Sequence, residues 1–176
     1  MSILNFEKST ISKSYLTISV LGNNYKLDIK YTTANCIELQ KNNFGFELIL
    51  PKRYKNKDNV EVINHAIQKL YTEVAKRELE ISMELVRHIV KFAPEDYQIK
   101  RIKNSFCKST RDKVLVINPD IIQYSREIIN TTLIQEFCKM KFKSGSKAYK
   151  EAIKTAIQRY EGYKSNSNLK NVGNFL

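Results

Sequence analysis

The sequence predicts an α+β fold: an antiparallel β meander packed by a long helix, followed by a helical core that includes a short strand pair. Three observations support this fold class. Apolar and polar residues alternate with the two-residue period of strands over residues 15–50. The 3.6-residue period of helices governs residues 58–93 and returns over residues 125–160. Between these helical regions, an alternating segment around Tyr97 and a short apolar run at Val114 predict two strands.

The predicted meander consists of strands separated by turns. In the first strand Leu16, Ile18 and Val20 alternate with small polar residues, which is typical of a half-buried strand. The turns at residues 22–24 and 41–43 contain Gly or Asn, which tolerate the positive φ angles of hairpin turns. We therefore expect four strands, at residues 15–21, 25–31, 35–40 and 44–50, closed by Pro51.

A long helix is expected after the meander. Apolar residues recur at intervals of three and four over residues 63–89, and Asp58 or Asn59 can cap the start of the helix. Pro94 ends it. A helix of more than about thirty residues exceeds the usual length, so we expect a break near residues 80–82.

A strand pair with a basic loop follows the long helix. The strands are expected at residues 97–103 and 114–117. The loop between them, at residues 104–113, carries Phe106 and Cys107 among lysines and arginines. A short helical turn at residues 121–124 then leads into the next helix.

Two helices complete the predicted core. The apolar face of the first is formed by Ile129, Leu133, Phe137 and Met140. We expect this helix to end at Gly145 and the second to occupy residues 146–160.

Size and composition favour one domain. The 176 residues, 42% of them apolar, are enough for a single hydrophobic core. We expect this domain to occupy residues 15–162, after a loose N-terminal lead-in of residues 1–14. Residues 163–176 are rich in Asn, Ser and Lys and show no period, so we expect a disordered tail.

Charge and cysteine content bound the function. Thirty Lys and Arg against eighteen Asp and Glu give a net charge of +12, which favours polyanionic partners. The sequence has no apolar run of about 18 residues, so we expect no membrane span. We also expect no secretory signal. Three widely spaced cysteines do not form a disulfide framework, so we expect a cytoplasmic protein.

The helix that begins near residue 125 has the spacing of a catalytic motif without its metal ligands. In the motif H-E-x-x-H, two histidines four residues apart bind zinc and the glutamate acts as general base. This sequence reads Gln135-Glu136-Phe137-Cys138-Lys139. The glutamate is present, whereas a glutamine and a lysine stand at the two ligand positions.

The order of these segments resembles the YgjP-like branch of the SprT- and WLM-related zinc metallopeptidases. Members of that family carry a Trp-Gly-Ser-Cys loop, a strand that ends near an Asn, the sequence His-Glu-Leu-x-His, and a third His before a Ser. The resemblance covers residues 15–163. It aligns Cys107 with the loop cysteine, Asn118 with the strand-ending Asn, and Glu136 with the general base.

The resemblance implies that all three zinc-ligand positions are substituted, by Gln135, Lys139 and Gly145. Glycine offers no ligand, an ammonium repels Zn²⁺, and a neutral amide is a poor ligand for this ion. We therefore expect no zinc cofactor and an inactive pseudo-peptidase that acts as a binding or regulatory module. Lys139 is expected to take the place of the metal's positive charge and to pair with Glu136.

Two other functions stay open. One is an active metal-dependent peptidase with a rebuilt ligand set, although His65 and His88 each lack a second ligand at suitable spacing. Cys107 as a nucleophile would need a neighbouring base, and no His lies beside it in the sequence.

The other open function is binding of nucleic acid or of an acidic protein by a basic former cleft, with Phe106, Cys107 and Asn118 as cleft-lining candidates. The basic patch expected around it consists of Lys100, Arg101, Lys103, Lys108, Arg111, Lys141, Lys143 and Lys147.

Overall fold

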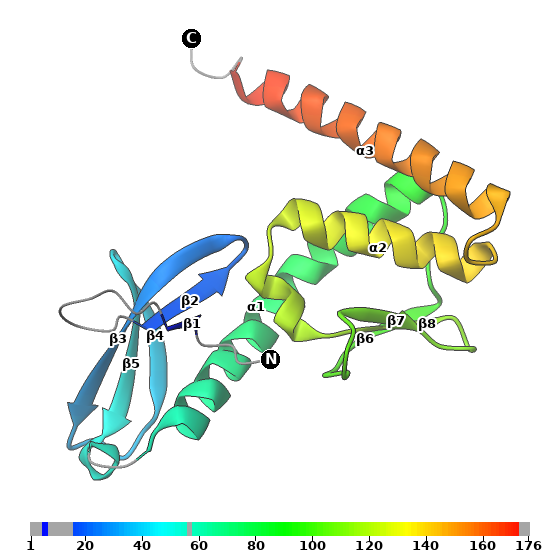
Figure 1. Ribbon diagram of the computed structural model, residues 1–176. Coiled ribbons are helices and arrows are strands. Elements are labelled where there is room, and N and C mark those ends of the chain that lie inside the picture. Colours follow the sequence, from blue (N-terminus) through cyan, green and yellow to red (C-terminus); the bar gives the residue numbers. More distant parts are fainter. Residues whose placement is uncertain (1–4, 7–15, 56–57, 173–176) are drawn as a thin grey trace. The chain divides into compact units, whose positions relative to one another are not determined.

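The computed structural model describes residues 5–6, 16–55 and 58–172. They form two compact units. Unit 1 contains the described residues up to Arg77 together with Pro119–Arg126, and unit 2 contains Glu78–Asn118 and the described residues from Glu127 onward. Each unit has a β-sheet of its own (Figure 1), which confirms the predicted α+β fold class.

Unit 1 is built on a five-stranded sheet. Its strands are β1 (Asn5–Phe6), β2 (Leu16–Val20), β3 (Asn23–Thr32), β4 (Glu38–Asn42) and β5 (Gly45–Pro51). In space they follow the order β1-β2-β3-β5-β4. Neighbouring strands run antiparallel except β3 and β5, which are parallel. Strand β1 falls within the predicted lead-in of residues 1–14, most of which lies outside the described residues.

The order of the strands corrects the predicted meander, in which β4 would lie beside β3. Instead β5 lies beside β3 and β4 forms the edge of the sheet. Burial explains the difference. In β5, Phe46, Leu48 and Leu50 are buried, whereas four of the five residues of β4 are exposed. The most apolar strand therefore takes a central place, and the polar strand takes the edge, where it stays in contact with water.

The two faces of this sheet differ in chemistry. Tyr71 of helix α1 (Val60–Val90) is buried and donates a hydrogen bond of 2.9 Å from its hydroxyl to the carbonyl of Ser19 in β2. The opposite face carries ion pairs, such as Lys30 with Glu47 at 2.6 Å. Helix α1 and the apolar face of the sheet thus enclose the core of unit 1.

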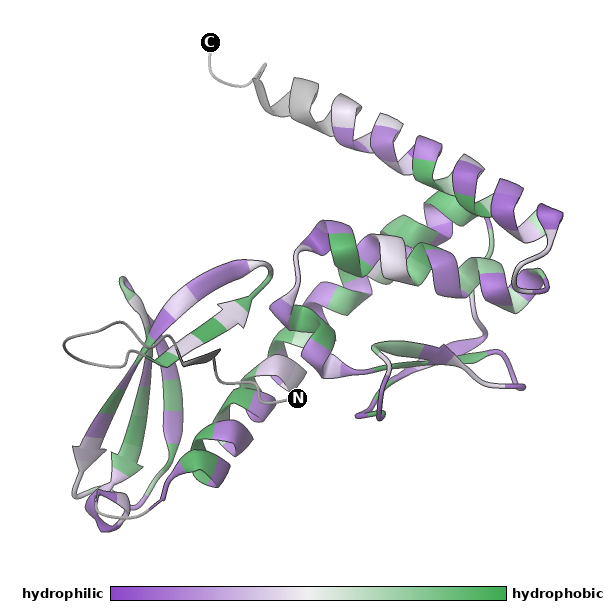
Figure 2. Cartoon of the chain, viewed as in Figure 1, coloured by the Kyte–Doolittle hydropathy of each residue, from purple (hydrophilic) through white to green (hydrophobic). Residues whose placement is uncertain are grey.

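Helix α1 is continuous over 31 residues, so the predicted break near residues 80–82 is wrong. The side chain of Asp58 accepts a hydrogen bond of 3.1 Å from the backbone N–H of Val60 and caps the helix, as predicted. Leu79 and Met83 on either side of the expected break are buried, and no Gly or Pro lies between them. Apolar residues recur along the whole helix (Figure 2), so its burial continues from unit 1 into unit 2.

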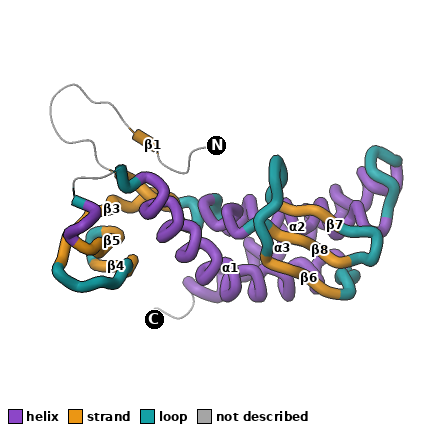
Figure 3. Tube along the Cα trace, turned by 90° about the horizontal axis from the view of Figure 1, so that it is seen from below, coloured by secondary structure: helices purple, strands orange, loops and turns teal. Residues whose placement is uncertain are grey.

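The sheet of unit 2 has three strands, one more than predicted. They are β6 (Asp96–Ile99), β7 (Cys107–Ser109) and β8 (Val114–Ile117), in the order β6-β8-β7 (Figure 3). Strands β6 and β8 are parallel, and β7 and β8 are antiparallel. The predicted strand at residues 97–103 ends at Ile99, and part of the predicted loop at residues 104–113 pairs as β7. A three-residue strand is too short to show an alternating pattern.

Helices α2 (Arg126–Lys141) and α3 (Lys147–Val172) complete unit 2. On α2 three residues of the predicted apolar face, Ile129, Leu133 and Phe137, are fully buried, and Met140 is half-buried. This helix ends four residues before the predicted stop at Gly145, and a short 3₁₀ turn (Pro119–Gln123) precedes it. In the part of the chain that the structure describes, no helix is long and apolar enough to cross a membrane.

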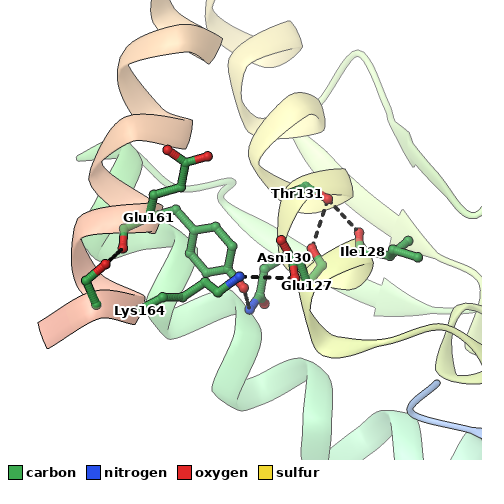
Figure 4. A network of polar contacts seen from close by, with 8 residues as sticks. Glu127, Ile128, Asn130, Thr131, Glu161 and Lys164 are labelled. Carbon is green, nitrogen blue, oxygen red and sulfur yellow. Dashed lines mark hydrogen bonds and ion pairs between the residues drawn. The ribbon is translucent and has the colours of Figure 1, made fainter. Parts of the chain in front are cut away.

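Helix α3 extends to Val172, well past the predicted end at Tyr160 and into the predicted tail. Polar contacts near the start of α2 join it to α3 at and beyond the predicted end of α3 (Figure 4). Asn130 donates a hydrogen bond of 3.1 Å to the Tyr160 hydroxyl, and Lys164 pairs with Glu127 at 3.0 Å. These pairings depend on tertiary structure, which the composition of the tail does not reveal.

Two glycines give opposite predictions for stability. Gly45 has φ of +153°, and a Cβ there would lie 2.3 Å from the carbonyl oxygen of Lys26 in β3. Gly162 is in α3, and a Cβ there would meet no heavy atom within 4 Å. We expect Gly45→Ala to lower the free energy of unfolding by at least about 1 kcal/mol. Gly162→Ala should raise it by about 0.5–1 kcal/mol, because alanine loses less entropy in a helix.

Urea denaturation followed by circular dichroism measures both changes. A neutral effect of Gly45→Ala would show that β3 and β5 do not approach as closely as this register requires.

Candidate functional site

Helix α2 divides the motif residues between the interior of unit 2 and solvent. Gln135 and Lys139 are on the exposed side, one turn apart, whereas Glu136 is buried with a side chain only 10% exposed. Cys138 is also buried. Glu136 is therefore a charged group that the fold carries into its interior.

Lys139 neutralises this buried charge, as the sequence predicted. Its ammonium lies 2.5 Å from Oε1 of Glu136 and donates a hydrogen bond to it. This hydrogen bond is the main cause that raises the pKa of Lys139 above its ordinary value, so the ammonium stays protonated at neutral pH. The carboxylate accordingly has a permanent cationic partner one helical turn away.

Cys107 lies near this pair and is kept as a neutral thiol. It is the first residue of β7 and is buried. Burial, followed by the negative charge of Glu136, raises the pKa of Cys107 to about 12. Nucleophilic attack needs the thiolate, which is scarce at neutral pH with such a pKa. Cys107 is thus suited to packing in this site and not to catalysis.

Asn118 holds the loop that precedes β7. Its side-chain amide donates hydrogen bonds to the carbonyls of Ile102, at 3.1 Å, and Ser105, at 3.4 Å. Its backbone N–H donates to the carbonyl of Phe106 at 2.8 Å. Phe106 itself is half-buried. These hydrogen bonds give Asn118 a structural function, because they hold residues 102–106 in place.

The third predicted ligand position has no donor to offer. Gly145 lies in the loop between α2 and α3 with φ of +80°, and the space around the position of its missing Cβ is open. Together with an ammonium and an exposed amide, this glycine does not fit the ligand set of a zinc site. In residues 5–6, 16–55 and 58–172, no three His, Cys, Asp or Glu side chains are grouped to hold a metal ion. His65 and His88 are both exposed on α1.

The eight residues of the predicted basic patch are all exposed, but strand register separates Arg111 from those in residues 100–103. Because β6 and β8 are parallel, residues 100–103 follow the carboxyl ends of these strands. Arg111 lies in the turn before the amino end of β8. Arg111 and residues 100–103 therefore lie at opposite ends of a sheet about 10 Å long.

Two features of the site were missed by sequence reasoning. Ser105 donates a hydrogen bond to the carbonyl of Cys107 and accepts one from its N–H, which fixes the start of β7. A serine two residues before an apolar residue in a loop is a signal for such a turn. Tyr149 on α3 is close enough to Lys139 to help raise its pKa, and only the tertiary structure reveals this proximity.

The ion pair predicts a measurable cost for removing Lys139. Lys139→Met leaves the Glu136 carboxylate buried and unpaired, so the free energy of unfolding should fall by about 1–2 kcal/mol, less than for a fully buried pair because Lys139 is 39% exposed. Lys76→Met is the matched control, since Lys76 pairs with Glu73 at the same spacing but in solvent, and it should cost less than about 0.5 kcal/mol.

Chemical denaturation of Lys139→Met, Lys76→Met, Glu136→Gln and the double variant Glu136→Gln/Lys139→Met measures these differences. The double variant should be less destabilised than the sum of its single variants. Equal effects of Lys139→Met and Lys76→Met would contradict a compensated buried charge.

Comparison with known proteins places the chain in a family. The family model described as YgjP-like, metallopeptidase domain, matches residues 4–170, which include every element of both units from β1 to most of α3. No curated protein matches the chain, and no solved structure does. The family model spans nearly the whole sequence, and the chain therefore belongs to the YgjP-like metallopeptidase family.

Proposed function

We propose that this chain is a non-proteolytic, zinc-independent member of the YgjP-like family, kept as a binding or regulatory module. The observation that carries the proposal is the hydrogen-bonded ion pair between Lys139 and Glu136. A general base must present a free carboxylate to the water that it activates. Here the carboxylate at the general-base position is engaged by an ammonium that stands at a ligand position.

A lysine is a chemically reasonable replacement for the positive charge of a metal ion beside Glu136. A buried carboxylate requires a nearby positive charge, and in the family a zinc ion supplies it. Lys139 supplies that charge from within the chain. This accounts for the presence of Glu136 where neither Gln135 nor Gly145 can bind a metal. An acidic protein is the partner that the chain's charge favours.

A cytoplasmic location agrees with the state of the cysteines. Cys36 is exposed and Cys107 and Cys138 are buried, and none of the three is in a disulfide. Free thiols are typical of a reducing compartment.

Zinc content tests the proposal. Purified protein without a polyhistidine tag, dialysed against trace zinc, should contain less than about a tenth of an equivalent. The variant Gln135→His/Lys139→His/Gly145→His restores imidazoles at the three predicted ligand positions and should take up about one equivalent. Elemental analysis measures both, and circular dichroism confirms that each protein is folded.

The matched control is Gln135→His/Lys141→His/Gly145→His, which adds three histidines without the four-residue spacing on α2. It should stay close to the wild-type zinc content. Near one equivalent in the wild type would reverse the proposal and favour an active metal-dependent peptidase with a rebuilt ligand set. Equal zinc uptake by the two triple variants would refute the assignment of the ligand positions.

A second candidate function is binding of nucleic-acid backbone, favoured by the exposure of all eight patch residues in a chain of charge +12. Affinity for a fluorescent single-stranded oligonucleotide should then fall by about tenfold or more between 50 and 200 mM salt. Lys141→Gln/Lys143→Gln/Lys147→Gln should weaken it more than Lys52→Gln/Arg53→Gln/Lys55→Gln, which removes the same charge from unit 1. Equal losses would indicate a nonspecific effect of net charge.

A further inference from the structure

Unit 1 contains a groove that takes no part in the site around Glu136. Its volume is about 670 Å³, and it lies between helix α1 and strand β4 with the residue that precedes this strand. All the residues that line it belong to unit 1. What it binds is therefore a question independent of the proposed function.

The helical side of the groove has an apolar floor and a charged rim. Val62, Ala66 and Leu70 follow one another at four-residue intervals and form the floor. The rim is the adjacent row of α1, which begins at Glu61 and ends at Glu73. At a rise of about 1.5 Å per residue, these two carboxylates mark a length of about 18 Å along the helix.

The opposite side is an open sheet edge. Strand β4 is the last in the order β1-β2-β3-β5-β4, and among the described strands none pairs with its outer edge. Leu39 lies opposite Leu48, which is fully buried, so Leu39 belongs to the apolar face of the sheet. Ile37 lies just before the strand and is 43% exposed. Apolar surface thus continues from the core of unit 1 to this edge.

The lysine of this edge strand is directed over the sheet. Edge strands commonly carry a Lys or Pro that prevents another strand from pairing. The only lysine of β4 is Lys41, and its ammonium lies 5.5 Å from the centre of the Tyr25 ring in β3. Since β5 separates β3 from β4, Lys41 reaches back across the sheet and leaves the edge open.

The groove is acidic although the chain is strongly basic. Glu61 and Glu73 face it against Lys69, which gives a net charge of −1 with His65 neutral. Glu38 also lines the groove, but strand alternation directs its side chain to the face opposite Leu39. Glu73 also forms an exposed ion pair with Lys76, which is weak enough to be exchanged for a cation of the ligand. The whole chain carries +12. The acidic lining disfavours nucleic acid here and favours a cationic ligand.

From these features we propose that the groove binds an extended basic peptide segment of another protein, which adds a strand to the outer edge of β4. Backbone hydrogen bonds to β4 hold the segment, and every second side chain faces α1. Apolar side chains in the middle of the segment contact the floor formed by Val62, Ala66 and Leu70. Lysine or arginine at each end pairs with Glu61 or Glu73.

The spacing of these groups defines a probe. In an extended peptide, side chains six residues apart are about 20 Å apart and face the same side. The heptapeptide KTVTVTK therefore presents two lysines at the separation of Glu61 and Glu73, with two valines between them. Fluorescence anisotropy of the labelled peptide, added to the full-length protein, measures its affinity. The acidic analogue ETVTVTE should bind at least about tenfold more weakly.

A charge-reversed groove provides the decisive comparison. Glu61→Lys/Glu73→Lys changes two exposed residues and should exchange the preference, so that ETVTVTE binds more tightly than KTVTVTK. Glu80→Lys/Glu84→Lys makes the same charge change on exposed residues of the same helix outside the groove and should keep the wild-type preference. Thermal denaturation checks that both variants are folded.

Strand addition has a signature of its own. Consecutive residues of a strand direct their backbone N–H groups to opposite sides. N-methylation of the valines or of the threonines therefore blocks only one side each, and one of the two methylated peptides should lose binding while the other keeps it. Equal affinities of the two methylated peptides would rule out strand addition.

Two further results would overturn the proposal. One is failure of KTVTVTK to bind at millimolar concentration. The other is dimerisation of the chain, seen by analytical ultracentrifugation, that Glu61→Lys/Glu73→Lys abolishes, because it would assign the groove to a second copy. Zinc content is independent of all these outcomes, so failure here leaves the proposed function untouched.

Discussion

A buried carboxylate has to be neutralised, and this constraint organises the site in unit 2. Glu136 is carried into the interior because α2 packs through Leu133 and Phe137 on either side of it in sequence. The charge is compensated from the exposed side of the same helix, by Lys139 at the next turn. The neighbouring Cys107 responds to the same constraint, since burial beside an anion keeps its thiol protonated.

The sequence was sufficient to predict elements whose pattern is local. The apolar period located α1 and α2, and Asp58 was correctly identified as a cap because capping involves residues two or three apart. Sheet order is not local. Whether β4 or β5 lies beside β3 depends on which strand gains more from being central, and the apolar content of β5 decides it. The uninterrupted α1 was missed because helix length is set by continued burial, not by a usual length.

The site shows the same division between local and tertiary information. The pairing of Glu136 with Lys139 could be predicted because residues three apart on a helix are neighbours. The bonds of Asn118 to Ile102 and Ser105 could not, because these groups are more than ten residues apart and are joined by the return of the chain through β7 and β8. An aligned polar residue was therefore expected to line a cleft, whereas the structure uses it to hold a loop.

Net charge is a poor guide to what each surface of this chain attracts. At physiological salt, electrostatic influence decays over about 8 Å, so a ligand responds mainly to the residues beside it. The groove of unit 1 presents Glu61 and Glu73 against Lys69. Unit 2 carries the eight exposed cations, with Arg111 at the opposite end of the sheet from residues 100–103. A chain of charge +12 can for this reason have an affinity for a cationic segment at one surface and for an anion at another. The two preferences depend on different residues, and each can be changed by substitution without altering the other.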